Sequence, residues 1–322
     1  MTQEASQLPD AGQSVSDTEL LHLDGLIGQT PTRRGSMAFF RNDRGALTQA
    51  LRAYGEWAQH EIAFCGRFLT PGDTVLDVGA YIGTHALAFA GFVGPAGHVH
   101  SFEAQPASFA LLAHNLADVA HVTAVHAAVS HNLAGASILL DEIDIAEPRS
   151  YGSAAIGDAS GKRPKIPVPA TTLDALDLRS CALVKIDVEG MEDQVLLGAE
   201  RLLSSCAPLI YAECNTVDAG SRVIARLRAC GYDVWMHLAD AYNPHNWRAN
   251  GTNIFGNAKE AALVGVPIRH RAACASLRCG PQETFFEIRT LDDLVAGMLL
   301  KPQYPREVLH GSSAFRPGGG HG

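Results

Sequence analysis

A short apolar segment that leads into a double-glycine turn and then a helix constrains the fold of this chain most. Residues 75–78, Val-Leu-Asp-Val, predict a buried parallel strand, because a strand covered on both faces is apolar throughout and does not alternate. Gly79 and Gly83 follow, where a missing side chain lets the backbone turn sharply and approach a ligand. Residues 86–92 then predict a helix. This order is typical of ligand sites in open α/β sheets.

The spacing within the turn separates two kinds of nucleotide site. Dinucleotide-binding proteins carry G-x-G-x-x-G here, which seats a pyrophosphate on the helix N-terminus. This chain has D-x-G-x-x-x-G from Asp77 to Gly83, which lacks the middle glycine and adds a carboxylate that attracts an ammonium or sulfonium group. Taken alone, the turn fits a nucleoside site and an ordinary strand-to-helix turn equally well.

Composition limits the classes of function. The 322 residues are 47% hydrophobic and 18% charged, as expected of one principal globular domain. A net charge of -9 argues against binding to nucleic acid or to an anionic membrane surface. There is no membrane-spanning apolar run, and residues 1–19 have no leader-like pattern, so we expect a cytoplasmic location. The seven cysteines include no C-x-x-C pair, which favours free thiols over disulfides or a zinc site.

Strand and helix patterns alternate through the middle of the chain, which predicts a doubly wound α/β sheet. The expected strands are 74–78, 98–102, 121–126, 182–188 and 208–213, and the expected helices are 83–93, 106–117, 192–204 and 219–229. Residues 232–237 and 253–255 are expected to form a closing antiparallel hairpin.

This pattern divides the chain into four parts. They are a disordered arm at 1–18, a helical segment at 19–70, a core domain at 71–257, and an extension at 258–322 that ends in a loose tail. Within the core domain, 131–170 predicts a hairpin insertion with a mobile loop. The helical segment could form a lid or the surface of a homo-oligomer.

Carboxylates stand at the ends of three predicted strands. Glu103 follows 98–102, where it can accept hydrogen bonds from both hydroxyls of a ribose, and we favour this role over a merely solvated side chain. Asp187 and Glu189 stand at the carboxyl end of another, 182–188, and Glu213 ends the next. Such groups can act as a general base, hold an ammonium group or ligate a hard cation.

Two details of this edge remain open on sequence alone. Asp187 and Glu213, together with Asn215, would suit Mg²⁺, although loose carboxylate clusters also occur as helix caps. Glu192 is expected only to favour the N-terminus of the next helix. Of the fourteen histidines, His85 directly follows the glycine turn and is the candidate nearest to the ligand, but no metal-binding spacing exists and a structural role is commoner.

Taken together, these residues resemble the FkbM-type methyltransferase family. The resemblance is carried by 75–83, by Phe102-Glu103-Ala104 and by 184–190, Val-Lys-Ile-Asp-Val-Glu-Gly. Weaker similarity extends it over about 40–267, at 42–44, 54–56, 242–248 and 253–256. One departure concerns Tyr81, where the family commonly carries Asn.

The resemblance implies a Rossmann-like fold with a mostly parallel seven-stranded sheet and an antiparallel closing strand. It also implies S-adenosyl-L-methionine as methyl donor and a hydroxyl oxygen of a sugar or secondary metabolite as acceptor, hence a small-molecule or glycan partner. The cofactor-binding positions are then Asp77, Gly79, Ala80, Tyr81, Gly83, Glu103, Ala104, Ala127 and Asp187. The catalytic candidates are Asp187, Glu213 and His85, with no assigned metal ligand.

Two alternatives remain open at this point. An NAD-dependent oxidoreductase would tolerate Glu103 but lacks its usual glycine pattern. A non-catalytic binding protein would retain the fold without the chemistry, although such a protein need not keep all of these acids.

Overall fold

The computed structural model describes residues 25–131, 136–152 and 164–302. The expected disordered arm at 1–18, the loose tail after 313 and the centre of the 131–170 insertion lie outside the described residues.

An eight-stranded sheet forms the centre of the fold, in the order β13-β11-β12-β10-β9-β3-β4-β5. Its parallel part confirms the sequence prediction almost residue for residue. These strands are β3 (Thr74–Val78), β4 (His98–Glu103), β5 (Val122–His126), β9 (Leu183–Ile186) and β10 (Leu209–Glu213). The central strands β3, β9 and β10 are mainly apolar and buried, as strands covered on both faces must be, whereas the edge strand β5 is mostly half-buried.

The antiparallel end of the sheet differs from the prediction in two ways. The closing pair is β11 (Asp233–Asp240) with β12 (Lys259–Val266), so the strand expected at 253–255 was wrong. There the Asn253 side chain bonds the backbone of Phe255 and Gly256, which makes a local turn. β13 (Glu283–Glu287) then pairs with β11 and makes the sheet one strand wider than the expected seven.

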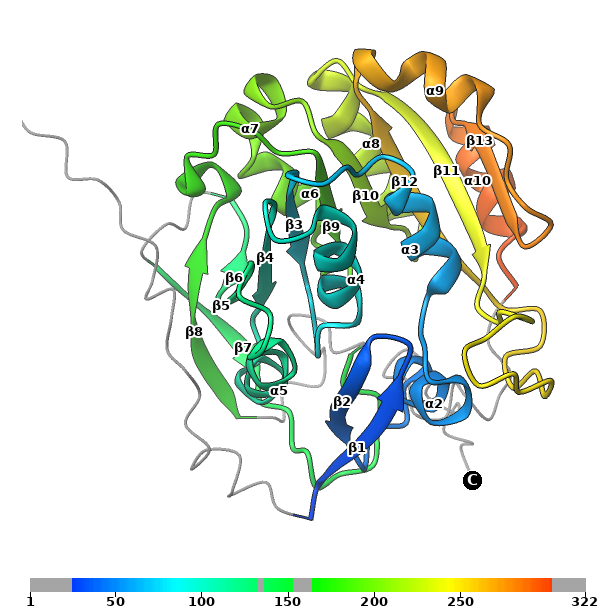
Figure 1. Ribbon diagram of the computed structural model, residues 1–322. Helices are drawn as coiled ribbons and strands as arrows, with labels where there is room; N and C mark the ends of the chain where they lie inside the picture. The colour runs from blue at the N-terminus through cyan, green and yellow to red at the C-terminus, as the bar shows by residue number, and fades with distance from the viewer. Residues whose placement is uncertain (1–24, 132–135, 153–163, 303–322) are drawn as a thin grey trace, which may run out of the picture.

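Helices cover both faces of the sheet, which confirms the doubly wound architecture (Figure 1). One face carries α3 (Gln59–Gly66), α4 (Thr84–Val93), α5 (Pro106–Leu116) and, beyond the short η2 (Ile268–His270), α9 (Arg271–Ser276). The other carries α6 (Glu192–Leu197), α7 (Glu200–Ser205), α8 (Val217–Ala229), α10 (Leu291–Leu299) and the short η1 (Leu173–Leu176).

The helix expected at 192–204 is broken into α6 and α7 because the chain passes close to another segment. A Cβ on Gly198 would lie 2.2 Å from the backbone oxygen of Ser130, so only glycine fits. The Gly198 carbonyl also accepts a hydrogen bond from Asp174 N at 3.0 Å, outside any helical pattern.

The N-terminal segment contains a hairpin that the sequence interpretation missed. β1 (Ile27–Thr32) pairs with β2 (Gly35–Phe40), and α2 (Ala46–Tyr54) and α3 follow as expected. The hairpin and α2 lie beyond the carboxyl ends of β3 and β9 (Figure 1). This segment therefore covers the edge at which open α/β sheets hold their ligands.

The remaining expectations concern the insertion, the thiols and the membrane. β7 (Ser137–Asp141) and β8 (Lys165–Thr171) form the expected antiparallel hairpin, with β6 (Ala128–Val129) beside β8. All seven cysteines are free thiols. Within the described residues, no helix has both the length and the apolar character needed to cross a bilayer.

Candidate active site

The glycine turn is held tightly between its two neighbouring strands. Gly79 has φ +78°, and a Cβ there would lie 1.7 Å from the backbone oxygen of Asp187. Its N–H and that of Ala80 both donate to the carbonyl oxygen of Phe102, at 3.0 and 2.9 Å. Gly79 is therefore required by close contact between backbones as well as by its dihedral angle.

The contacts of Tyr81 show what a tyrosine does at a position where the family commonly carries asparagine. It adopts φ +50°, a left-handed conformation that asparagine tolerates better than tyrosine. Its hydroxyl donates to Asp43 Oδ2 at 3.0 Å, and this buried carboxylate also accepts from Gly45 N and Tyr151 N. Burial and the charge of Asp43 raise the pKa of Tyr81, so the phenol stays a donor. Asp43 thus ties the turn to the N-terminal segment.

Glu103 lies at the end of β4 and faces the same turn. Its carboxylate accepts from Tyr81 N at 2.9 Å and from Gln105 N at 2.8 Å, which orients both oxygens. Burial raises the pKa of Glu103 to about 7, although these two hydrogen bonds oppose the shift. Two further predicted positions lie beside it, since Ala127 N donates to the Glu103 carbonyl at 3.1 Å and the Ala104 carbonyl bonds His126 Nε2.

A buried lysine that the sequence interpretation did not assign joins the acids of two strands. Lys185 Nζ lies 3.5 Å from Asp77 Oδ1, 3.2 Å from Asp187 Oδ2 and 3.2 Å from the Gly79 carbonyl. Burial alone would lower the pKa of Lys185, but Asp187 and Asp77 outweigh it and raise that pKa. Asp77 is fully buried and pairs with Lys185. Its carboxylate is therefore not exposed at the ligand-binding edge of the sheet.

Three carboxylates converge at the ends of β9 and β10. Oxygens of Asp187, Glu189 and Glu213 lie within 4.8 Å of one another. Burial by itself would raise the pKa of Asp187, but Lys185 and a hydrogen bond with Glu213 lower it. Burial and the neighbouring charge of Asp187 raise the pKa of Glu213 well above its ordinary value and that of Glu189 to about 8. Asp187 is therefore the most acidic carboxyl of the three and the one that ionises first.

Two more acids surround this cluster and extend its negative character. Glu61 comes from α3 and Glu260 from β12, and burial raises the pKa of both, that of Glu61 to about 8. Neither had a recognisable sequence signal, because Glu61 lies in a helix of the N-terminal segment and Glu260 in a strand that the sequence pattern did not predict. The signal for Lys185 was available, since a lysine in an otherwise apolar strand needs a buried partner.

His85 borders the acid cluster as a neutral group. Its Nε2 lies 3.8 Å from Glu61 Oε2, and burial lowers the pKa of His85 to about 3. It can accept or position a proton but does not titrate near neutral pH. His237 is structural, since it is buried between Tyr211 and Glu283, at 2.9 and 3.2 Å.

The structure brings most of the predicted site residues to one edge of the sheet but changes two minor assignments. Glu189 joins Asp187 and Glu213, whereas Asn215 is exposed and accepts from Lys301 Nζ at 2.8 Å. Glu192 is the first residue of α6 and accepts from the N–H groups of Val188 and Gly190, in keeping with its expected role at the N-terminus of a helix.

A comparison with protein families identifies this arrangement. Residues 77–234 match the family model for the methyltransferase FkbM domain, from the acid of the glycine turn to the start of β11. The chain carries a methyltransferase FkbM domain. The match contains Glu103, Asp187 and Glu213, whereas the N-terminal hairpin and β13 lie outside it.

Solved structures similar to this FkbM-domain protein include three methyltransferases. Methyltransferase FkbM from Methylobacillus flagellatus KT is 15% identical, with 63% of this chain and 50% of that chain covered and a TM-score of 0.39. A SAM-dependent O-methyltransferase from Thermotoga maritima is 13% identical, with 83% of this chain and 87% of that chain covered and a TM-score of 0.38. Precorrin-6y C5,15-methyltransferase from Geobacter metallireducens GS-15 is 15% identical, with 64% of this chain and 87% of that chain covered and a TM-score of 0.39. No curated protein matches the chain.

Proposed function

We propose that this protein transfers the methyl group of S-adenosyl-L-methionine to a hydroxyl oxygen of a small-molecule or glycan acceptor. One observation carries the proposal: Glu103 and Asp187 flank the same glycine turn. Glu103 bonds the turn at Tyr81 N, and the Asp187 backbone contacts Gly79. A nucleoside whose ribose meets Glu103 would then direct its cationic end towards Asp187 and the other acids.

The residues of the turn would bind the donor by shape and charge. Ala80 and Gly83 add little side-chain bulk beside Gly79, and the small side chains of Ala104 and Ala127 would leave room for a flat base at the ends of β4 and β5. The donor carries positive charge on its sulfonium and ammonium groups, which the carboxylates around Asp187 would stabilise. We assign the cofactor-binding role to these residues together with Asp77, which acts through Lys185.

The transfer itself is an in-line displacement. The acceptor oxygen forms a bond to the methyl carbon while the carbon–sulfur bond breaks, which leaves neutral S-adenosylhomocysteine and a proton to be removed. Asp187 is the best placed base, because it is ionised and its side chain is 36% exposed. Glu213 shares the proton through its hydrogen bond with Asp187, and the neutral His85 helps to exclude water and to orient the acceptor.

Mg²⁺ is a second candidate for the same place. The oxygen-only donor set of Asp187, Glu189 and Glu213 suits a hard cation. The ammonium of Lys185 already neutralises part of this charge, so we propose a reaction that needs no added metal. Dialysis against EDTA should leave turnover unchanged; loss of turnover that MgCl₂ restores would assign the ion instead.

Calorimetric titration tests the donor assignment directly. Wild-type protein should bind S-adenosylhomocysteine and not NADH, whereas binding of NADH alone would favour an oxidoreductase. Transfer of tritiated methyl groups into an extract of the native host should then identify the acceptor. No transfer, despite binding of the donor product, would favour a non-catalytic protein.

Replacement of Asp187 tests the base. Asp187→Asn should lower kcat about 100-fold, the lower range for loss of a general base. Its melting temperature should stay near that of wild type, because the amide still reaches Lys185 and Glu213. Asp240→Asn is a matched control at a partly exposed ion pair with Lys259 and should keep full activity. Equal kcat values for Asp187→Asn and wild type would refute the role of Asp187.

A further inference from the structure

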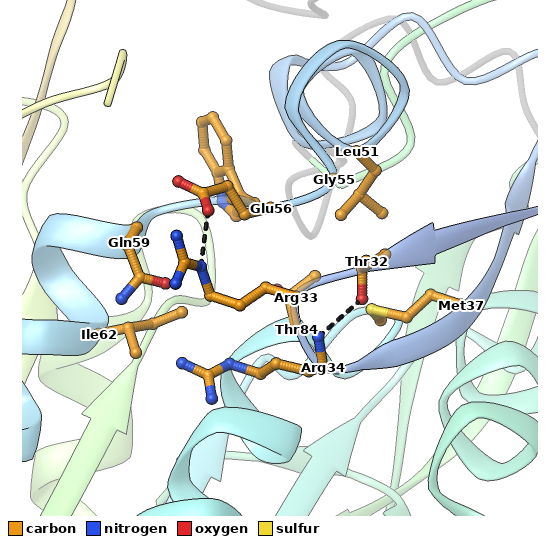
Figure 2. Close-up of a pocket in the computed structure, with 11 residues that line it drawn as sticks. Thr32, Arg33, Arg34, Met37, Leu51, Gly55, Glu56, Gln59, Ile62 and Thr84 are labelled. Carbon is orange, nitrogen blue, oxygen red and sulfur yellow. Dashed lines mark hydrogen bonds and ion pairs between the residues drawn. The ribbon is translucent and has the colours of Figure 1, made fainter. Parts of the chain in front are cut away.

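A pocket beside the acid cluster contains an arginine without a counter-charge. The pocket lies between the tip of the β1–β2 hairpin, the C-terminal end of α2, the start of α3 and the start of α4 (Figure 2). It encloses about 270 Å³ of empty space, its open mouth included. Because this volume includes open solvent, the enclosed part is much smaller, so the pocket suits one small group and not a whole ligand.

The two adjacent arginines of this pocket differ sharply in their partners. Arg33 Nε donates to Glu56 Oε2 at 2.7 Å (Figure 2). Glu56 also accepts from Asn243 and Trp247. Arg34 lies with its guanidinium 6.0 Å from the centre of the Phe92 ring. Among the described residues, no carboxylate or carbonyl pairs with that guanidinium, and Figure 2 shows its end near Ile62, whereas the Arg33 guanidinium lies near Gln59.

An unpaired cation in this setting is unfavourable without a ligand. Burial lowers the pKa of Arg34, and the charge of Arg33 lowers it further, with only Glu56 opposing them. The guanidinium still stays charged at any physiological pH, so an anion is the group that would relieve the cost. The start of α4 at Thr84 lines the same pocket and adds the partial positive charge of a helix N-terminus.

The pocket adjoins the proposed site of methyl transfer. Thr84 lines the pocket and directly precedes His85, and the charges of Asp187 and Arg34 both act on the His85 imidazole. In the same way, α3 contributes Gln59 and Ile62 to the pocket and Glu61 to the acid cluster. A substrate with its anionic group at Arg34 would therefore extend towards Asp187.

We propose that Arg34 and this pocket bind an oxyanion, a carboxylate or phosphate group carried by one of the two substrates. A planar guanidinium fork is suited to both groups. The assignment to a substrate rests on the proposed function; binding of an oxyanion does not. The oxyanion has two sources, an acidic acceptor or the methionine carboxylate of the donor. If the acceptor supplies it, the pocket should still bind an oxyanion when S-adenosylhomocysteine is already bound.

The first experiment titrates inorganic phosphate and acetate into the full chain. Wild type should bind at least one of them saturably, and Arg34→Met should weaken this binding at least tenfold. Methionine keeps the apolar contact with Phe92, and equal melting temperatures would confirm that the variant folds. Arg52→Met is the matched control, because Arg52 also lies over a phenylalanine ring but outside the pocket, and should bind within twofold of wild type.

The second experiment separates the two sources. If the acceptor supplies the oxyanion, phosphate or acetate should also bind the complex with S-adenosylhomocysteine, and Arg34→Met should leave the affinity for S-adenosylhomocysteine unchanged. If the donor supplies it, S-adenosylhomocysteine should exclude the ions. Arg34→Met should then weaken S-adenosylhomocysteine tenfold and leave 5′-methylthioadenosine, which lacks the carboxylate, unaffected.

The proposal is overturned if Arg34→Met binds phosphate, acetate and S-adenosylhomocysteine as tightly as wild type does. It is also overturned if wild type binds neither ion saturably and Arg34→Met leaves S-adenosylhomocysteine binding unchanged. Failure of wild type to bind S-adenosylhomocysteine would instead refute the proposed function, and the ion titration of the free protein would still decide the pocket.

Discussion

Single residues in the site combine structural and chemical roles. Lys185 holds Asp77 and Asp187 together and also bonds the carbonyl of Gly79, so one ammonium group supports both the turn and the proposed base. Glu103 is oriented by backbone N–H groups, but burial makes its ionised form unfavourable and raises its pKa. The protein retains this unfavourable charge at the place where a ribose would offer two donors.

Glu103→Gln should therefore change the stability of the free protein in a pH-dependent way. The folded pKa of about 7 lies above the ordinary 4.5, so folding favours the protonated acid and stability falls as pH rises from 4.5 to 7. An uncharged amide removes this loss but offers one acceptor oxygen in place of two, so the variant's stability relative to wild type should be roughly 2 kcal/mol more favourable at pH 8 than at pH 4.5. Urea unfolding at the two pH values measures it. An equal effect at both would show that the carboxyl is not perturbed.

Lys185→Met should destabilise the fold by about 3 kcal/mol at pH 8, because it leaves Asp77 and Asp187 without their shared cation. The loss should be smaller at pH 5, where one carboxylate can take a proton. Urea unfolding compares it with Lys259→Met, which breaks a more exposed pair with Asp240 and should cost under about 1 kcal/mol. Equal losses for the two variants would contradict a structural role for Lys185.

At the scale of elements, buried parallel strands were predictable and edge elements were not. The strand at 74–78 is matched in full, because an apolar run between turns has few alternative structures. The β1–β2 hairpin has mixed polarity and a Thr-Arg-Arg-Gly tip, so its pairing depends on packing against α2 and α5 and not on a local pattern.

The same limit applies to the site. Acids at strand ends could be placed from sequence, because parallel strands finish at one edge of the sheet. Asp43, Glu61 and Arg34 could not, because they come from the N-terminal segment and reach the site only through its tertiary packing. The tyrosine at position 81 was visible as an oddity, but its partner Asp43 was not.

Glu56 joins three elements, and its replacement should loosen them locally. It accepts from Arg33, from Asn243 Nδ2 at 2.6 Å and from Trp247 N at 2.9 Å. Glu56→Gln offers one acceptor oxygen in place of two, so the amide hydrogen of Trp247 should exchange at least tenfold faster by mass spectrometry. Glu287→Gln, at the exposed Arg289 pair, is the control. Unchanged exchange in Glu56→Gln would show that the loop is held by its apolar contacts.

For the whole molecule, acids contributed by five separate elements gather at one edge of the sheet. Glu61, Glu103, Asp187, Glu189 and Glu213 come from or directly follow α3, β4, β9 and β10, and Glu260 comes from β12. Burial and mutual repulsion raise most of their pKa values, so several of these carboxyl groups are partly protonated near neutral pH in the free protein. A bound ammonium group and ribose hydroxyls would favour the ionised forms.

Binding of S-adenosylhomocysteine at pH 7.5 should therefore release about one proton, because the pKa values of Glu103, Glu189 and Glu61 lie at about 7 to 8 in the free protein. Calorimetric titration in phosphate and in Tris measures the number, since the two buffers differ in ionisation enthalpy. At pH 9 these carboxyls are already ionised, and the release should fall towards zero. Glu103→Gln should reduce the release at pH 7.5, whereas Glu287→Gln should not. Identical enthalpies in the two buffers at pH 7.5 would mean that the ligand does not meet the acidic edge, and would separate donor binding from these carboxylates.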